Sequence, residues 1–407
     1  MLDGYLDKMC VIGAGGRMGR GIALLLLLRL YYTPQESQLL LIDTNAKMLD
    51  LLKEYLKVQF QKKGLSWEKA SKILRFSEDI TEGKDYKLIF EAIIEDMEVK
   101  AHAFRTLEAD SNHASYYLSN TSSLPLHELS ERAKLDGRLI GAHFYNPPPV
   151  QSLLEVITPT QIDPQLIRIT EELAQSLGKT VVFSKDVAGF IGNGHFIREL
   201  VYACREVHRA EHPLPVAIAA LDDVTHRFLI RPMGIFHLVD FLGVDVCTQI
   251  GRIMDEHQEE GDFSDPLLDR MIAEGAIGGL WEDGTQKDGF FRYENGQPVA
   301  VYSLEEKSYI PLPELSNLGS PPKGYFPWRA LHKNPQAAAI LNAYVENLKE
   351  DTSLGGQIAQ NYLVNSAKIA QLLVEQGVAK SIQEVDTVLR LGFHHLITPL
   401  SLHPQLA

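Results

Sequence analysis

Short apolar runs and longer amphipathic segments alternate along residues 8–184, and this pattern strongly constrains the fold. Apolar runs of four to six residues suit buried strands, and the amphipathic stretches suit helices that cover a parallel sheet. Strands are predicted at residues 9–12, 39–42, 88–91, 116–119, 139–144, 153–157 and 180–183. Helices should fill most gaps, and one should begin at Asp163-Pro164, because aspartate caps free amides and proline fits a first turn.

A glycine-rich turn at residues 13–19 joins the first predicted strand to an apolar helix. Glycines are needed in such a turn because a Cβ atom would block it and keep the backbone away from a dinucleotide pyrophosphate, which rests on the helix N-terminus. One residue more than the G-x-G-x-x-G spacing is present, so two registers are open. They run through Gly13, Gly15 and Gly19, or through Ala14, Gly16 and Gly19.

Asp43 ends the second predicted strand. A carboxylate there would accept hydrogen bonds from an adenosine ribose and repel a 2′-phosphate, which favours NAD over NADP. A tight turn without a ligand is the alternative. Strand, turn, helix, strand and terminal acid in this order predict a Rossmann-type doubly wound sheet in an α/β domain at residues 1–185, with NAD as its cofactor.

The remaining residues contain few strand-like runs. They predict an all-helical C-terminal domain at 186–295, an irregular Gly- and Pro-containing connection at 296–340, and a partial second helical repeat at 341–407. The repeat is offset by 164 residues, so that Asp222 pairs with Asp386. Chance similarity between amphipathic helices is the alternative, because such helices repeat apolar residues in any case.

Composition limits the partners of the chain. Its 407 residues are 45% hydrophobic and carry a formal net charge of −14, which argues against a nonspecific nucleic-acid or anionic-membrane surface. The three cysteines are far apart and have no metal-ligand spacing, so no metal site is expected. No signal peptide or membrane-spanning run is recognised, and a cytoplasmic location is the simplest interpretation.

His143 and Glu155 flank a proline-rich bend between two predicted strands. An imidazole titrates near neutral pH and can take a proton from an alcohol, while a carboxylate on its other nitrogen fixes the tautomer and stabilises the imidazolium. The bend could bring the two side chains within hydrogen-bond reach. The alternative is a structural histidine in a strand and a surface glutamate.

Five sequence motifs occur in the order of a known family. They lie at residues 13–23, 91–100, 119–124, 143–155 and 185–193. Over residues 8–293 the chain therefore resembles the L-3-hydroxyacyl-CoA dehydrogenase family. A weaker match begins at Arg231-Pro232-Met233-Gly234 and includes Asp240, which in the family belongs to the helical domain.

The resemblance implies reversible, NAD-dependent oxidation of the 3-hydroxyl group of an L-3-hydroxyacyl-CoA, as in fatty-acid β-oxidation or related acyl-CoA metabolism. His143 would take the hydroxyl proton and Glu155 would hold its imidazole. Ser122 and Asn193 would hydrogen-bond the substrate oxygens near the reacting carbon, a role that suits positioning rather than proton transfer.

The resemblance also implies that Glu95, Lys100 and Asn146 line the cofactor cleft, beside Asp43 and the glycine turn. The extra residue in that turn is the departure with the most direct consequence, because a shifted backbone could weaken NAD binding.

Two other functions stay open at this stage. One is a dehydrogenase of a free hydroxy acid or sugar acid, since the same base could serve any secondary alcohol. The other is a non-catalytic NAD-binding protein. For assembly, the helical repeat suggests either a homodimer or a monomer whose second repeat takes the place of a partner subunit.

Overall fold

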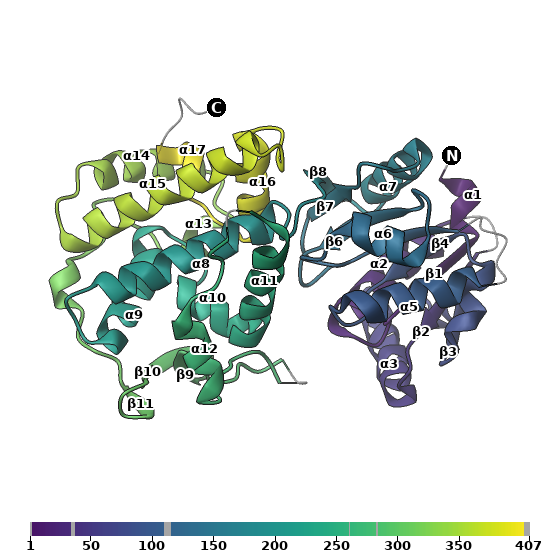
Figure 1. Cartoon of the computed structure of the whole chain (residues 1–407), viewed down its shortest axis with the longest axis horizontal. Helices are drawn as coiled ribbons and strands as arrows, with labels where there is room; N and C mark the ends of the chain where they lie inside the picture. The colour runs from purple at the N-terminus through teal and green to yellow at the C-terminus, as the bar shows by residue number, and fades with distance from the viewer. Residues whose placement is uncertain (1, 34–36, 110–114, 260, 282–283, 403–407) are drawn as a thin grey trace. The chain divides into compact units, whose positions relative to one another are not determined.

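The computed structural model describes residues 2–33, 37–109, 115–259, 261–281 and 284–402. The chain forms two compact units, Met1–Phe190 and Ile191–Ala407. The sequence placed the corresponding boundary at residue 185. The first unit contains a large sheet with helices on both faces, and the second is mainly helical (Figure 1).

The first unit is built on an eight-stranded sheet in the order β3-β2-β1-β4-β5-β6-β7-β8. The strands are β1 (Lys8–Ile12), β2 (Gln38–Ile42), β3 (Leu74–Ser77), β4 (Leu88–Glu91), β5 (Tyr116–Ser119), β6 (Leu139–Phe144), β7 (Leu153–Thr158) and β8 (Thr180–Lys185). All seven predicted strands are present, and the doubly wound α/β fold is confirmed. The eighth, β3, escaped prediction because its side chains are only half-buried or exposed and form no apolar run.

Helices cover both faces of this sheet (Figure 1). On one face lie α2 (Arg17–Tyr31), α3 (Ala46–Lys62) and α7 (Pro164–Ser176). On the other lie α5 (Met97–Glu108) and α6 (Leu126–Ala133). The remaining short helices are α1 (Asp3–Leu6), α4 (Trp67–Ser71) and η1 (Ile80–Asp85). As predicted, the Asp163 carboxylate caps α7.

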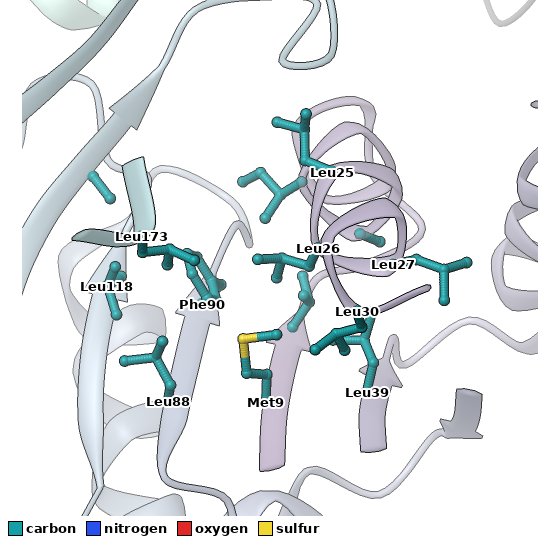
Figure 2. Packing of buried hydrophobic residues seen from close by; sticks show 14 of the residues in the cluster. Met9, Leu25, Leu26, Leu27, Leu30, Leu39, Leu88, Phe90, Leu118 and Leu173 are labelled. Atoms are coloured by element: carbon teal, nitrogen blue, oxygen red, sulfur yellow. The ribbon is translucent and has the colours of Figure 1, made fainter. Parts of the chain in front are cut away.

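Side chains alternate between the two faces along each strand. Met9 of β1 belongs to the core beneath α2, whereas its neighbour Cys10 belongs to the core beneath α5. Figure 2 shows Leu26 and Leu30 of α2 lying over Met9, with Phe90 of β4 beside them. Burying one such leucine contributes roughly 2 kcal/mol, so this apolar helix holds the first βαβ unit and the glycine turn in place.

Strand direction reverses once within the sheet. The pair β6 and β7 is antiparallel, whereas the other neighbouring strands pair in parallel. In the antiparallel register His143 lies directly opposite Glu155. Alternation along the strands places both on the face shared with Leu139 and Ile157, beneath α6.

The second unit is organised around a long helix pair, α8 (Gly192–Arg209) and α15 (Leu354–Glu375), which pack together (Figure 1). The other helices are α9 (Leu214–Asp223), η2 (Val224–Phe228), α10 (Ile235–Leu242), α11 (Val244–His257), α12 (Pro266–Ala273), η3 (Ser316–Leu318), α13 (Trp328–Leu331), α14 (Ala337–Lys349), α16 (Ile382–Gly392) and α17 (Pro399–Leu402). In the part of the chain that the structure describes, no helix combines the length and apolarity required to span a bilayer.

Equivalent aspartates occur in the two helical segments. Asp222 is buried and accepts a hydrogen bond of 2.9 Å from the His237 amide in the first turn of α10. Asp386 is also buried and accepts one of 3.4 Å from the Leu400 amide in the first turn of α17. Each carboxylate thus holds the start of a helix, and the helical repeat stays a prediction. Residues 403–407, the end of that repeat, lie outside the described part.

Two predictions for the second unit were wrong, because the segment predicted as all-helical, 186–295, ends in a strand, and the segment predicted as an irregular connection, 296–340, contains regular structure. A three-stranded antiparallel sheet forms from β9 (Phe291–Glu294), β10 (Gln297–Ser303) and β11 (Ser308–Pro311). The two residues between β9 and β10, Asn295 and Gly296, have positive φ angles of 52° and 73°. Such angles at both positions are those of a type I′ hairpin turn, for which Asn-Gly is the favoured sequence. The hairpin was not predicted, because the segment contains many other glycines and prolines.

Candidate active site

His143 and Glu155 form a buried pair across the β6–β7 hairpin. His143 Nδ1 lies 3.2 Å from Glu155 Oε2, so the predicted hydrogen-bond reach is present. Glu155 is fully buried and His143 is 7% exposed. An imidazole whose Nδ1–H is held by a carboxylate presents the Nε2 lone pair as its proton acceptor. The pair therefore has the geometry of a base and its orienting carboxylate.

Tyr145 is a third member of this group that the sequence interpretation did not include. Its hydroxyl donates a hydrogen bond of 3.0 Å to Glu155 Oε2. Its ring centroid lies 4.7 Å from that of His143, and Phe190 packs on the same imidazole at 6.2 Å. Tyr145 follows His143 by two residues, so the period of a strand was the signal that could have found it.

Lys179 fixes the proline-rich bend between β6 and β7. Its ammonium donates a hydrogen bond of 2.6 Å to the Pro148 carbonyl and another to the Gln151 carbonyl. Burial lowers the pKa of Lys179 to about 8. The Gln151 side chain donates to the Asn146 carbonyl at 3.2 Å, so the backbone of the predicted cofactor residue Asn146 is held from within the bend.

Glu95 anchors the loop that carries Ser122. Its Oε1 atom accepts hydrogen bonds from the Ser122 amide at 2.8 Å, the Ser123 amide at 3.1 Å and the Thr121 hydroxyl at 2.7 Å. Burial opposes ionisation of Glu95, but the Lys100 ammonium and these hydrogen bonds lower its pKa below the usual value. Glu95 is therefore an ionised group that shapes the serine loop.

Lys100 is a buried ammonium held between two carboxylates. Its Nζ atom lies 2.5 Å from Glu91 and 3.3 Å from Glu95. Burial disfavours its charged form, but the two carboxylates raise the pKa of Lys100 above the usual value. Glu91, at the end of β4, also accepts a hydrogen bond from Ser119 of β5. Glu91 was not predicted as a site residue, although it begins the motif at residues 91–100.

At three positions of the glycine turn there is no room for a side chain. Gly13 has a φ angle of 75°, and a Cβ atom on it would lie 2.5 Å from the Ala92 carbonyl oxygen. A Cβ atom on Gly19 would lie 2.0 Å from the Gly13 carbonyl oxygen, and one on Gly15 would lie 2.6 Å from Met48. The three glycines match those of a dinucleotide site, which allow the tight turn, the close approach of the backbone to the pyrophosphate and the close packing of the helix.

Gly16 does not share this restriction. A Cβ atom there would lie 3.4 Å from the Gly13 carbonyl oxygen, which is ordinary contact. The register through Gly13, Gly15 and Gly19 is therefore favoured over the one through Ala14 and Gly16. Asp43 reinforces this register, because its Oδ2 atom accepts a hydrogen bond of 3.0 Å from the Gly15 amide.

Asn193 lies in the first turn of α8, in the second unit. The other predicted catalytic positions, Ser122, His143 and Glu155, belong to the first unit. The structure brings His143 and Glu155 into contact, and it places Ser122 on the loop that Glu95 holds.

Known protein families match both units. Residues 8–187 match the NAD binding domain of 3-hydroxyacyl-CoA dehydrogenase, and residues 189–288 match its C-terminal domain. The chain belongs to the 3-hydroxyacyl-CoA dehydrogenase family. A probable 3-hydroxybutyryl-CoA dehydrogenase of Deinococcus radiodurans is 30% identical over 295 residues, which cover 70% of this chain and 100% of that protein. A 3-hydroxybutyryl-CoA dehydrogenase of Mycobacterium tuberculosis is 33% identical over 217 residues, covering 52% of this chain and 73% of that protein.

The similarity in fold to one solved structure extends over nearly the whole of this chain. The crystal structure of 3-hydroxybutyryl-CoA dehydrogenase from Escherichia coli K12 covers 99% of this chain and 92% of that one, with a TM-score of 0.71 and 22% identity. The helical segments beyond residue 288 are thus part of a known fold. As a member of this family, the chain is an NAD-dependent oxidoreductase that interconverts 3-hydroxyacyl-CoA and 3-ketoacyl-CoA.

The residues of the first unit fit NAD. Gly13 and Gly15 lie before the N-terminus of α2 and Gly19 lies in its first turn, where the positive end of the helix dipole favours a pyrophosphate. Asp43 Oδ1 accepts from the Asn45 amide while Oδ2 holds Gly15, so the carboxylate is fixed at the end of β2. A fixed carboxylate there suits a ribose diol.

Gly15→Ala tests the favoured register, because Gly19 is common to both registers. The added methyl group would lie 2.6 Å from Met48 and 2.8 Å from Asp43 Oδ2 and would displace the turn, so NADH binding should weaken at least about tenfold, or 1.4 kcal/mol. Fluorescence titration of NADH measures the change, and the thermal midpoint checks folding. Gly16→Ala is the matched control and should bind NADH as the wild-type protein does. Equal weakening by both substitutions would contradict the assignment.

Proposed function

We propose that His143 is the general base of this dehydrogenase and Glu155 its orienting partner. In the oxidation direction His143 Nε2 takes the proton of the C3 hydroxyl group. The glycine turn and Asp43 would hold NAD, which would supply the hydride acceptor for C3. The observation that carries this proposal is the buried contact of 3.2 Å between His143 Nδ1 and Glu155 Oε2 across the β6–β7 pair.

Glu155 suits this role because it is a buried carboxylate beside the nitrogen that does not react. Its negative charge stabilises the imidazolium formed when His143 takes the proton, and its position fixes the imidazole tautomer. In the reduction direction the same imidazolium returns the proton to the C3 oxygen. A general base of this kind contributes roughly 10²–10⁴ to the rate.

We propose that Ser122 and Asn193 position the substrate oxygen. The support for Ser122 is its place on a loop that Glu95 holds through two amides and the Thr121 hydroxyl. The support for Asn193 is the sequence motif at residues 185–193 and its place in the first turn of α8. Neither group titrates near neutral pH, so both would bind rather than transfer protons.

The proposed cofactor residues are Gly13, Gly15, Gly19, Asp43, Glu95, Lys100 and Asn146. For the glycines and Asp43 the support is the steric room and the fixed carboxylate described above. For Glu95 and Lys100 it is their ion pair of 3.3 Å, between the buried Lys100 of α5 and the partly exposed Glu95, on the segment that follows β4 beside the glycine turn. For Asn146 it is the bend that holds its backbone.

We propose that the acyl group of the substrate has four carbons. Similar proteins from Deinococcus radiodurans and Mycobacterium tuberculosis are named 3-hydroxybutyryl-CoA dehydrogenases, which supports acetoacetyl-CoA as the first substrate to measure. Comparison of C4, C8 and C16 3-ketoacyl-CoA substrates with NADH determines the preference.

His143→Gln should reduce the rate of NADH oxidation with acetoacetyl-CoA by roughly 10²–10⁴, because glutamine keeps polarity but cannot carry the proton. NADH binding should be unchanged, since the glycine turn is untouched. Absorbance of NADH measures the rate. Free acetoacetate is the matched substrate control and should give little turnover.

Two results would contradict this account. Undiminished turnover by His143→Gln would remove the histidine from the reaction. Equal rates with acetoacetate and acetoacetyl-CoA would favour a dehydrogenase of free hydroxy acids instead.

We further propose a monomer in which the second helical repeat takes the place of a partner subunit. The support is the packing of α15 along α8 within one chain. Light scattering of the full chain should then give a mass near 45.6 kDa, and twice that mass would indicate a homodimer.

We propose a cytoplasmic location without nucleic-acid or membrane partners. The support is the net charge of −14 together with the free cysteines Cys10, Cys204 and Cys247. A fluorescent fusion examined in cells tests the location, and enrichment in an organelle would contradict it.

A further inference from the structure

Two donors converge on one carboxylate oxygen beside the proposed base. Glu155 Oε2 lies 3.2 Å from His143 Nδ1 and accepts a hydrogen bond of 3.0 Å from the Tyr145 hydroxyl. Glu155 is fully buried, and Tyr145 is 8% exposed. The contact between Glu155 and His143 is sufficient to orient the imidazole. The hydrogen bond from Tyr145 to Glu155 therefore needs a separate explanation.

The Tyr145 hydroxyl is a permanent donor. Burial, together with the negative charge of Glu155, raises the pKa of Tyr145 well above its usual value. The phenol therefore keeps its proton throughout the pH range in which a histidine titrates. A hydrogen bond from a neutral donor stabilises the ionised carboxylate and reduces the negative charge that the carboxylate presents to a second donor.

Two neighbours of Glu155 on the sheet are apolar. Its partner on β8 is Val182, and Ile157 follows it on the same face of β7. Phe190 packs on His143 from the end of the first unit. His143 of β6 and Tyr145, which directly follows β6, both contact Glu155 Oε2. At a buried carboxylate such as Glu155 a single hydrogen bond has a larger electrostatic effect than it has in water.

We propose that Tyr145 is a positioning residue. Its hydrogen bond partly neutralises the Glu155 carboxylate and so sets the pH range in which His143 accepts a proton. This inference rests on the proposed role of His143 as base. The Tyr145 proton stays on its oxygen throughout, and only the substrate proton moves to His143. Without the phenol, Glu155 would hold the imidazolium more strongly, and His143 would release its proton at a higher pH.

Tyr145→Phe removes the hydroxyl and keeps the ring that packs on His143. The acid limb of kcat/KM for 3-hydroxybutyryl-CoA oxidation should move to higher pH by about half to one unit, the effect of one neutral hydrogen bond. The plateau at high pH should stay within about threefold of the wild-type value, because the base and its partner remain.

Tyr117→Phe is the matched control. Tyr117 is also buried on the sheet and donates a hydrogen bond of 2.6 Å to a carboxylate, that of Glu108, but it does not contact His143 or Glu155 in the described structure. Its pH profile should coincide with that of the wild-type protein. Thermal midpoints of both variants separate an effect on folding from an effect on the base.

An NMR titration of the His143 ring, assigned with His143→Gln, gives a readout that needs no substrate. The titration midpoint in Tyr145→Phe should rise by the same amount as the acid limb. Identical His143 titration in the wild-type protein and Tyr145→Phe, or a rate loss that is uniform in pH, would overturn the role of Tyr145. Absence of acyl-CoA turnover by the wild-type protein would instead overturn the proposed function, and the titration would still test the contact.

Discussion

The reversal of strand direction between β6 and β7 is the constraint on which the candidate site depends. It sets His143 opposite Glu155 and places both on the same face of the sheet. A shift of one residue in this pairing would turn one side chain to the opposite face and separate base from carboxylate. Lys179 holds the connecting bend through backbone carbonyls, so register and bend support each other.

The parallel strands supply the rest of the site from one edge. In a doubly wound sheet, ligands bind beyond the carboxyl ends of the strands. The glycine turn follows β1, Asp43 follows β2, and Ser122 follows β5. Each is fixed by a contact made inside the unit, as Asp43 holds Gly15 and Glu95 holds Ser122. The glycine turn, Asp43 and Ser122 thus all depend on one edge of the sheet, whereas the other proposed substrate residue, Asn193, lies in the second unit.

Much of this arrangement could be predicted from the sequence. Buried parallel strands are apolar throughout, so their runs stand out, and every predicted strand is present. The strand β3 and the β9–β11 sheet are different, because their half-exposed residues give weak periodicity and only Asn295-Gly296 marks the hairpin. The hydrogen bonds from the serine loop to Glu95 join residues far apart in the sequence and were not predictable. The strand period could have pointed to Tyr145, but its hydrogen bond to Glu155 was not predicted.

We propose that His143 and Glu155 act as one catalytic unit. The most direct measurement is a double-mutant cycle of kcat for acetoacetyl-CoA reduction, with His143→Gln, Glu155→Gln and the double variant. Residues that act as a unit give strongly non-additive losses. The account predicts that the double variant is about as slow as His143→Gln alone. Losses that multiply, or a Glu155→Gln variant as fast as the wild-type protein, would contradict it.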